Sequence, residues 1–314
     1  MKIKHFTDSD LDGVSCGLLS DLVLEDCEVT PAGPESINTK LERLLDAEAK
    51  GRKIFDRIII TDLSVSPELA ERIEKTDKYR VKLYDHHKTA EFLNQYEWAT
   101  VQVEDETGRL MSGTEIYWRE YISKLAGKGL LGRSKNAVRI QLVEEYVSLV
   151  TQYDTWLWHK EGNLTPKFLN HLLSIYGPQL FKDNIQTAIL EKPVLLTDGD
   201  LTMARAEEAR LNKYIRTKID DVVEMDVLGY SFGVVFAEQY KSELGNRMCE
   251  EYDIDVAAII DVGPGSISYR TAKDTIDLSV IAGKFGGGGH AKAAGSSFSE
   301  DLSMDFLMRI FDAR

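Results

Sequence analysis

The sequence predicts an α/β protein with a larger N-terminal domain built on a parallel sheet and a smaller α/β domain at the C-terminal end. Short apolar runs alternate with helix-like stretches up to about residue 84, strand-like runs resume after about residue 225, and 314 residues suffice for two domains. We expect a first domain over residues 1–195, a connecting helix within 196–224 and a second domain over 225–314.

The first domain begins with alternating strands and helices. The apolar runs at 1–6, 58–60 and 81–84 are predicted strands, and the segments 14–24, 40–49 and 67–74 are predicted helices. Ser66 followed by Pro67 is typical of a helix start, which places Asp62 in the loop between a strand and a helix. Repeated strand, helix and strand units favour a parallel sheet.

The rest of the chain becomes helical before strands return. Residues 113–153 have a helical pattern, interrupted between Gly127 and Ser134 by glycine-containing stretches that we interpret as a surface loop. Residues 201–222 have the composition of a connecting helix. Strand-like runs at 231–236, 256–260 and 267–270 then indicate the second domain.

Composition limits the partners that the protein can bind. The formal net charge is -14 and the isoelectric point is near 5.0, which argues against a broad basic surface for long duplex nucleic acid. The three cysteines, Cys16, Cys27 and Cys249, are widely spaced, as expected in a reducing compartment. No apolar stretch approaches the roughly 20 residues that cross a bilayer, so we expect a soluble cytoplasmic protein with no membrane partner.

Acidic residues and a histidine pair follow the predicted strands. In chain order they are Asp8, Asp10 and Asp12, then Asp62, then Asp85-His86-His87. Ligand sites of open α/β sheets lie outside the carboxyl ends of the parallel strands, so these side chains should meet in one place. Carboxylate oxygens and imidazole nitrogens suit Mn²⁺, Mg²⁺ or Fe²⁺ better than a metal that needs thiolates. The pattern therefore predicts a divalent metal site.

The acidic segment 8–13 has other interpretations. It matches the start of a calcium loop of the EF-hand type, but the glutamate expected at the twelfth position is Leu19 and the preceding segment is strand-like. It also resembles a haloacid dehalogenase-type phosphatase, with Asp10 as nucleophile and Asp12 as acid and base, although this leaves the histidine pair unexplained. An aspartate here could also cap the helix that begins near Val14.

The order of these motifs resembles the DHH phosphoesterase family, which is named for its Asp-His-His sequence. Residues 8–13 resemble its first motif, Thr61-Asp62 its second, Asp85-His86-His87 its third, and Asp154 within residues 152–156 its fourth. Residues 286–295 resemble the glycine-rich signature of the DHHA1-type domain that follows in many members. The resemblance implies a DHH domain and a DHHA1-type domain, with the active site in the cleft between them.

The resemblance also implies two divalent cations, with Mn²⁺ preferred and Mg²⁺, Co²⁺ or Fe²⁺ left open. The implied metal ligands are Asp8, Asp10, Asp12, Asp62, Asp85, His86 and Asp154. Asp8 and Asp10 would hold one ion, Asp12, His86 and Asp154 would hold the other, and Asp62 would bridge the two. The implied catalytic residues are Asp62, His86 and His87, of which His87 would contact the phosphate or support the metal ligands. Without the resemblance, Asp154 would be an ordinary carboxylate at a helix end.

One departure from the family pattern selects a branch. Many members place a metal-binding histidine at the position that is Phe6 here, and His5 is one residue away, on the opposite face of a strand. Asp8 would supply the missing ligand, as in the exonuclease-like branch. The resemblance therefore favours an oligoribonuclease that hydrolyses short single-stranded RNA to mononucleotides.

Other functions stay open at this stage. They are a phosphatase of 3'-phosphoadenosine 5'-phosphate, a cyclic dinucleotide phosphodiesterase, and a nucleotide-sensing or RNA-binding protein without catalysis. The expected partners are short RNA oligonucleotides or small nucleotides, and a homodimer is left open.

The glycine-rich segment is the candidate for substrate binding. Gly287, Gly288 and Gly289 would expose main-chain amides, followed by a helix near residue 291 whose dipole favours phosphate. By composition alone, a tight turn packed on residues 293–294 explains the glycines equally well. The resemblance makes His290 a contact of the terminal or scissile phosphate, and it makes Arg270 and Lys241 candidates for a second phosphate or the bases.

Overall fold

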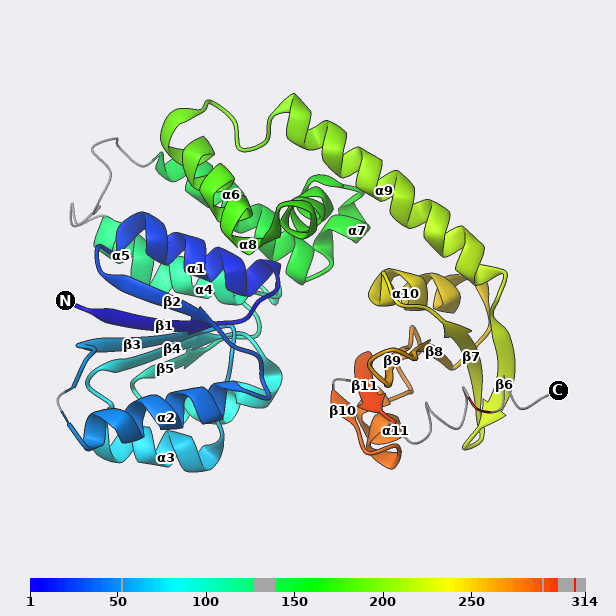
Figure 1. Cartoon of the computed structure of the whole chain (residues 1–314), viewed down its shortest axis with the longest axis horizontal. Coiled ribbons are helices and arrows are strands. Elements are labelled where there is room, and N and C mark those ends of the chain that lie inside the picture. The colour runs from blue at the N-terminus through cyan, green and yellow to red at the C-terminus, as the bar shows by residue number, and fades with distance from the viewer. Residues whose placement is uncertain (52, 127–138, 290, 299–307, 309–314) are drawn as a thin grey trace. The chain divides into compact units, whose positions relative to one another are not determined.

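The chain divides into two compact units in a computed structural model that describes residues 1–51, 53–126, 139–289, 291–298 and 308. Unit 1 comprises Met1–Arg205 and unit 2 comprises Ala206–Arg314 (Figure 1). The division falls inside helix α9 (Asp198–Ile219). It does not fix the predicted domain limits at residues 195 and 225, which stay predictions. The loop predicted between Gly127 and Ser134 lies outside the described residues.

Unit 1 is built on a parallel sheet of five strands in the order β2-β1-β3-β4-β5. The strands are β1 (Ile3–Thr7), β2 (Cys27–Pro31), β3 (Arg57–Thr61), β4 (Val81–Asp85) and β5 (Ala99–Val101). The chain leaves β1 for the edge strand β2 and returns to β3 on the other side of β1. The strand order therefore reverses between β1 and β3, and such a switch point is where open α/β sheets bind their ligands.

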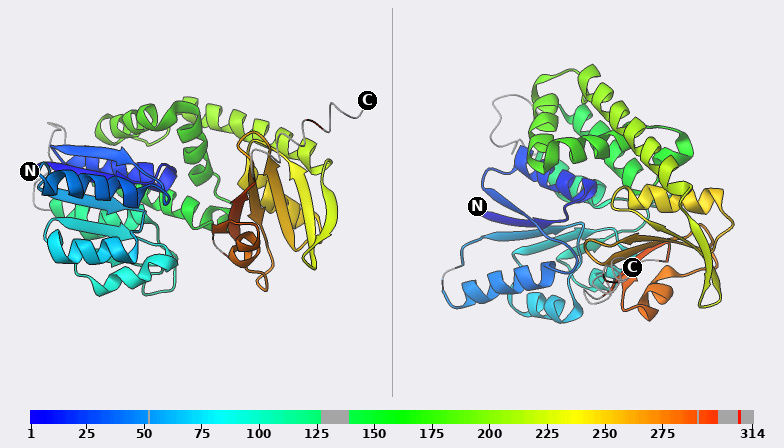
Figure 2. Two further views of the ribbon diagram at one scale, coloured as in Figure 1. Left: turned by 60° about the horizontal axis from the view of Figure 1, so that its bottom comes forward. Right: turned by 45° about the vertical axis from the view of Figure 1, so that its right-hand side comes forward.

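Helices cover both faces of this sheet, as Figures 1 and 2 show from three directions. One face carries α1 (Leu11–Val23), α4 (Gly113–Tyr117), α6 (Ile140–Asp154) and α8 (Thr165–Glu191). The other face carries α2 (Ile37–Ala49) and α3 (Pro67–Thr76). Shorter turns are η1 (Lys88–Gln95), η2 (Trp118–Ile122), α5 (Ser123–Ala126) and α7 (Leu157–Glu161).

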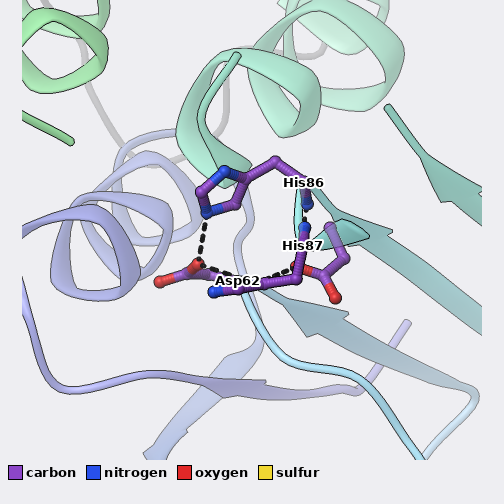
Figure 3. A group of neighbouring side chains, drawn as sticks. Asp62, His86 and His87 are labelled. Carbon is purple, nitrogen blue, oxygen red and sulfur yellow. Dashed lines mark hydrogen bonds and ion pairs between the residues drawn. The ribbon is translucent and has the colours of Figure 1, made fainter. Parts of the chain in front are cut away.

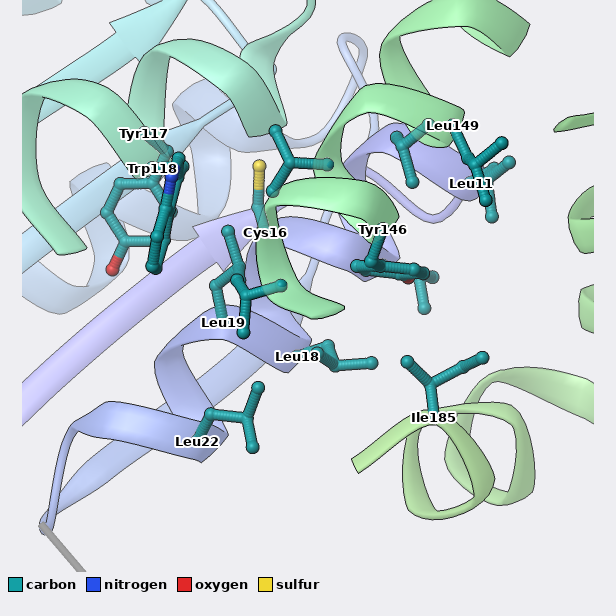
Figure 4. Close-up of a cluster of buried hydrophobic side chains, with 14 of the residues drawn as sticks. Leu11, Cys16, Leu18, Leu19, Leu22, Tyr117, Trp118, Tyr146, Leu149 and Ile185 are labelled. Atoms are coloured by element: carbon teal, nitrogen blue, oxygen red, sulfur yellow. The ribbon is translucent and has the colours of Figure 1, made fainter. Parts of the chain in front are cut away.

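Helix α1 is the central helix of unit 1. Nearly all its residues are buried, because β1 lies on one side and α4, α6 and α8 pack on the others. Leu18 and Leu19 contribute fully buried side chains to this core, alongside Tyr146 from α6 and Ile185 from α8 (Figure 4). The start of α1 is therefore held rigidly at the carboxyl end of the sheet.

Unit 2 contains a mixed sheet in the order β10-β11-β9-β8-β7-β6. The strands are β6 (Val223–Val227), β7 (Tyr230–Phe236), β8 (Val256–Asp261), β9 (Ser266–Arg270), β10 (Gly288–Gly289) and β11 (Ala293–Ser297). Strands β7 and β8 are parallel and joined by α10 (Lys241–Glu251), and the other pairs are antiparallel. Helix α11 (Leu278–Lys284) packs against the sheet through Leu278 and Ile281, which join an apolar cluster with Phe232 and Tyr269.

The helix predicted near residue 291 is wrong, because strand β11 begins at Ala293 instead. The glycines allow this strand to approach closely. A side chain on Gly287 would collide with the main chain of Gly295, and one on Gly289, whose φ is +139°, would lie 2.6 Å from the Cα atom of Ala294. Close packing of β10 on β11 thus explains two of the glycines.

None of the helices in the described ranges is long and apolar enough to cross a membrane.

Candidate metal centre

The carboxyl ends of three neighbouring strands carry the predicted acidic residues. Strand β1 leads into the segment that contains Asp8, Asp10 and Asp12, Asp62 follows β3, and Asp85 ends β4 directly before His86 and His87. Because β1, β3 and β4 are adjacent and parallel, these ends lie at one edge of the sheet. This edge includes the switch point between β1 and β3.

Two groups of potential metal ligands share His86. The first consists of Asp62, Asp85, His86 and His87, and the second of Asp12, His86 and Asp154. Within each group the ligand atoms lie within 4.8 Å of one another. The Nε2 atom of His86 lies 3.3 Å from Oδ1 of Asp62 (Figure 3) and 3.5 Å from Oδ2 of Asp154. Asp154, the last residue of α6, thus joins residues from the sheet edge.

Asp12 is held by the N-terminus of α4. Its Oδ2 atom accepts a hydrogen bond of 2.7 Å from the amide of Gly113, and its Oδ1 atom accepts one of 2.9 Å from the amide of Thr114. The hydroxyl of Thr114 donates to the main-chain carbonyl of Asp12 (2.8 Å). A carboxylate at a helix N-terminus is stabilised by free amides and by the helix dipole. Asp12 is thereby fixed in one orientation towards His86, 3.8 Å away.

Asp85 provides the test of whether the site fits a cation. The side chain is fully buried, and its Oδ1 atom accepts from the amides of His86 and His87 and from Nδ1 of His87 at 2.7 Å. Its Oδ2 atom is buried and has no hydrogen-bond partner among the described residues. An unsatisfied buried carboxylate oxygen is unfavourable. A divalent cation would satisfy it, so the donor set fits one.

Charge repulsion within the site also favours cations. Burial, followed by the negative charges of Asp12 and Asp10, raises the pKa values of Asp62 and Asp154 well above the usual range of an aspartate. Burial lowers the pKa of His86, which keeps the imidazole neutral and able to bind a metal. Bound divalent cations would allow the carboxylates to stay ionised together.

His87 behaves differently from its neighbour. Burial alone would lower its pKa, but the hydrogen bond from its ring to Asp85 and the charge of that carboxylate outweigh burial and raise the pKa to about 9. The hydrogen bond to Asp85 therefore favours a proton on Nδ1 of His87.

Asp62 has a strained main chain. Its φ is +55°, in the left-handed region that aspartate adopts less readily than glycine. Such conformations cost on the order of 1–3 kcal/mol and persist only where the surroundings enforce them. The amide of Asp62 donates to the carbonyl of Tyr84 (2.9 Å), which fixes the turn after β3 against β4. In this conformation the carboxylate lies beside His86, with Oδ1 at 3.3 Å from Nε2.

Asp8 and Asp10 belong to neither group. The Oδ1 atom of Asp8 accepts from the amide of Ser9, and Asp10 caps α1 by accepting from the amide of Gly13 at 2.9 Å. The capping alternative therefore describes Asp10, and its part in metal binding stays a prediction, as does that of Asp8. Leu19 lies inside the buried core of α1, so a calcium loop of the EF-hand type is excluded.

The predicted substrate residues lie in unit 2. Arg270 is half-buried, and its guanidinium donates to Oγ of Ser242 (2.6 Å). Lys241 forms an ion pair with Asp261 at 2.7 Å. Gly288 is open to solvent, and a side chain there would meet nothing within 4 Å. His290 lies outside the described residues.

Sequence patterns missed the residues that support the ligands. Gly113 and Thr114 are not ionisable and lie far along the chain from Asp12. A signal for them was present, since Ser112 caps α4 by accepting from the amide of Glu115, and a serine before a helix is a standard start signal. Nothing in the sequence alone indicated that this helix start faces Asp12.

Comparison with known proteins shows the family of this chain. No family model matches the chain. The oligoribonuclease NrnB of Bacillus subtilis (strain 168) is 35% identical over 311 residues, which cover 98% of this chain and 75% of that protein. The chain belongs to the DHH phosphoesterase family, in its oligoribonuclease NrnB branch. An uncharacterised mimivirus protein, R106, is 39% identical over 168 residues, covering 46% of this chain and 40% of its own.

Solved structures show that the DHH phosphoesterase fold is shared. The exonuclease RecJ bound to manganese aligns over 100% of this chain and 90% of its own with a TM-score of 0.56 and 14% identity. PggH, a pGpG-specific phosphodiesterase from Vibrio cholerae, aligns over 99% of both chains with a TM-score of 0.53 and 14% identity. At such identities the likeness concerns the fold alone.

Membership in the family decides whether the protein is an enzyme, and it leaves the substrate open. This DHH phosphoesterase is a hydrolase that acts on phosphoester bonds, of the nuclease and phosphodiesterase type. It is therefore an enzyme rather than a nucleotide sensor or a simple RNA-binding protein. The haloacid dehalogenase interpretation is wrong, because the relationship over nearly the whole chain is to a DHH enzyme.

Proposed function

We propose that this DHH phosphoesterase hydrolyses short single-stranded RNA oligonucleotides to mononucleotides, using two divalent cations of which Mn²⁺ suits the site best. The observation that carries the proposal is the pair of ligand groups joined by His86, with carboxylates and imidazoles as donors. A relative of 35% identity named an oligoribonuclease supports RNA as the substrate class.

In this proposal the residues of unit 1 bind the cations and contact the phosphate. Asp12, His86 and Asp154 would hold one cation, Asp8, Asp10 and Asp85 would hold the other, and Asp62 would bridge the two. Bound divalent cations lower the pKa of a water molecule and neutralise charge on the phosphate. His87, held by Asp85, contacts a phosphate oxygen or supports the metal ligands.

Unit 2 would bind the rest of the substrate. We assign Arg270 to a phosphate or a base, because Ser242 holds its guanidinium in place beside the start of α10. Gly288 would meet the terminal phosphate through its open main chain, and His290 is a further phosphate contact implied by the family resemblance. Lys241 is the weaker candidate, since Asp261 already neutralises its charge.

Net charge supports a short substrate. With a formal net charge of -14, the protein repels long polyanions. A short oligonucleotide bound at the metal site is attracted by the cations and meets little of the other negative charge. The three cysteines are free, which supports our proposal that the enzyme acts in the reducing cytoplasm.

A substrate panel tests the proposal. Purified protein would be incubated with Mn²⁺ and either an RNA dinucleotide, 3'-phosphoadenosine 5'-phosphate or cyclic di-AMP, and products would be separated by chromatography. We expect mononucleotides from the dinucleotide at the highest kcat/KM and no turnover after chelation by EDTA. Faster release of phosphate from the phosphoadenosine substrate, or faster opening of cyclic di-AMP, would replace RNA with that substrate.

Variants make the same experiment specific to the site. Asp62→Asn should lose at least about 100-fold in kcat because it removes a ligand from the first group. Asp46→Asn is the matched control, since Asp46 is an exposed carboxylate on α2 that pairs only with Arg72 among the described ion pairs. Equal loss in both variants would contradict the assignment of Asp62.

A further inference from the structure

A continuous chain of buried polar groups lies behind the metal centre. It crosses β1, β3, α1 and α4, the elements that carry or support the candidate ligands. Each link is a hydrogen bond between 2.7 and 2.9 Å. From α4 to α1, the groups are the Tyr117 hydroxyl, the Ser20 hydroxyl, the His5 imidazole, the Thr61 hydroxyl, the Thr7 hydroxyl and the Gly13 carbonyl.

The end at Gly13 sets the direction of every bond in this chain. A carbonyl only accepts, so the single hydroxyl proton of Thr7 points to Gly13, and Thr7 must accept from Thr61. Thr61 has then used its proton and must accept from Nε2 of His5. His5 is therefore the Nε2–H tautomer, and its Nδ1 atom accepts from Ser20. The hydroxyl of Tyr117 completes the series by donating to Ser20.

A neutral imidazole satisfies these directions, because one ring nitrogen donates while the other accepts. His5 is fully buried, and this burial lowers its pKa to about 3. The ring is therefore neutral throughout the physiological range and joins the two halves of the chain without titrating.

The half of the chain beyond Nε2 of His5 begins and ends on residues next to candidate ligands, whereas the half beyond Nδ1 reaches α1 at Ser20 and α4 at Tyr117. Thr61 directly precedes Asp62, whose main chain is strained. Gly13 donates its amide to Asp10, and a side chain on Gly13 would collide with the main-chain carbonyl of Asp8. The chain thus connects the turn after β3 with the acidic loop after β1.

We propose that His5 is a positioning residue for phosphoester hydrolysis, linking Thr61 to α1 so that Asp62 and the acidic loop keep a fixed separation. This inference rests on the proposed function, the hydrolysis of short RNA. His5 does not touch the substrate, because its ring lies wholly within the core. Loss of a link would shift the carboxylates against each other, and small displacements of this kind reduce rates by up to about 100-fold.

The test uses Thr61→Val, which keeps the shape of the side chain and removes the hydroxyl that joins His5 to Thr7. Thr61→Ser restores a hydroxyl and serves as the conservative rescue. Tyr146→Phe is the matched control for general damage to the core, because Tyr146 is fully buried and its hydroxyl contacts Ser15 on α1, outside the chain of bonds. For each variant we would measure kcat, KM, thermal stability and the Mn²⁺ concentration at half-maximal activity.

We expect Thr61→Val to lower kcat and raise the half-saturating Mn²⁺ concentration by about tenfold or more, with KM nearly unchanged. Thr61→Ser should recover most of both, and Tyr146→Phe should lose stability without either change. Wild-type kcat and Mn²⁺ dependence in Thr61→Val, with only stability lost, would overturn the positioning role.

A direct binding measurement separates this inference from the proposed function. If the wild-type protein hydrolyses no RNA, the function fails, and Mn²⁺ affinity from calorimetry still decides the role of His5. Tenfold weaker binding in both Thr61→Val and Ser20→Ala than in Tyr146→Phe would support the inference, because Ser20→Ala breaks the link of His5 to α1 and keeps the bond between Thr61 and Thr7. Equal binding in all three variants would refute it. Nitrogen-15 NMR of labelled histidine should show His5 as the Nε2–H tautomer, and the opposite tautomer would contradict the assigned bond directions.

Discussion

The amide of Gly113 donates a hydrogen bond of 2.7 Å to the Oδ2 atom of Asp12. The same glycine lies against Asp62, because a Cβ atom at position 113 would be 3.0 Å from both Asp12 Oδ2 and Asp62 Cβ. Helix α4 therefore begins in contact with two candidate ligands, one on α1 and one directly after β3. Because Gly113 has no side chain, Asp12 and Asp62 both have room beside it.

Gly113→Ala should disturb this contact. The added methyl group must displace Asp12 or Asp62, so we expect kcat to fall by about tenfold or more while the fold is retained at a cost of about 1–3 kcal/mol. Activity assays and chemical denaturation measure the two effects. Gly283→Ala on α11 is the control, since a Cβ atom there would meet nothing within 4 Å. Unchanged kcat in Gly113→Ala would show that this contact has no role in catalysis.

Asp85→Asn should distinguish the roles of the two carboxylate oxygens of Asp85. The amide oxygen can still accept the hydrogen bonds from His86 and His87, whereas an NH₂ group replaces the unpartnered oxygen that we assign to a cation. We expect about 10- to 100-fold weaker Mn²⁺ binding in calorimetry, with a circular dichroism spectrum like that of the wild type. Wild-type Mn²⁺ affinity would mean that Asp85 only orients His87.

Arg270→Met should affect substrate binding rather than the chemical step. Removing the guanidinium held by Ser242 is expected to raise KM for an RNA dinucleotide by about tenfold, with kcat within about threefold of the wild-type value. Steady-state kinetics over a range of dinucleotide concentrations give both constants. Arg247→Met is the control, because Arg247 is a more exposed arginine on α10 that pairs with neighbouring glutamates. The same KM in Arg270→Met and the wild type would remove Arg270 from the substrate site.

The lowered pKa of buried His5 predicts that the stability of the protein depends on pH. Its pKa is about 3 in the folded protein against 6.5 in the unfolded chain, so below about pH 6.5 only the unfolded chain takes up the proton. The contribution of His5 is thus complete above pH 6.5 and is lost as the pH falls towards 3. Between pH 8 and pH 5 the loss is about 2 kcal/mol.

Urea denaturation of His5→Gln at these two pH values measures that loss. The variant should be less stable at pH 8, but its stability should fall by about 2 kcal/mol less than that of the wild type on acidification. Tyr146→Phe, which leaves His5 in place, should keep the wild-type dependence. An identical pH dependence in His5→Gln and the wild type would show that the ring is not buried in its neutral form.

A buried ion pair should matter for stability but not for activity. Arg80 precedes β4, at the opposite end of that strand from Asp85, and its guanidinium lies 2.7 Å from both Glu48 and Asp77. Arg80→Met leaves Glu48 buried without its partner, so we expect a loss of about 3–5 kcal/mol in the free energy of unfolding. The half-exposed pair of Lys78 and Glu74 provides the control Lys78→Met, which should lose much less stability because water screens this pair.

Activity assays at low temperature, where both variants are folded, complete this comparison. The kcat of Arg80→Met should stay close to the wild-type value, because the ion pair lies away from the ligands. A large fall in kcat would mean that the two ends of β4 are coupled.

The strand ends were predictable because apolar runs and the polar residues that follow them are local features. Asp62 lies in the predicted loop, and Ser66 caps α3 by accepting from the amide of Leu69, as expected from the following Pro67. The hydrogen bond between Gly113 and Asp12 spans 101 residues, and no local pattern predicts such a contact. The same reason explains why His5 looked like an isolated histidine until Thr61 and Ser20 were seen beside it.

Other elements were missed or misassigned because tertiary packing overrides local preference. Strand β2 is short and half-exposed, and Glu28 and Thr30 interrupt its apolar residues, so its sequence lacks an apolar run. Residues 291–295 contain three alanines and suggest a helix, but Ala293 and Ala294 pair with β9. Hydrogen bonding to a neighbouring strand determines the structure there.

Anomalous diffraction from crystals soaked in Mn²⁺ tests the central claim most directly. We predict two manganese peaks on either side of His86, each about 2 Å from ligand atoms, one beside Asp12 and Asp154 and the other beside Asp62 and Asp85. The account would be contradicted if fully occupied manganese sites lay elsewhere on the protein and these carboxylates bound no metal, while the crystals hydrolysed substrate.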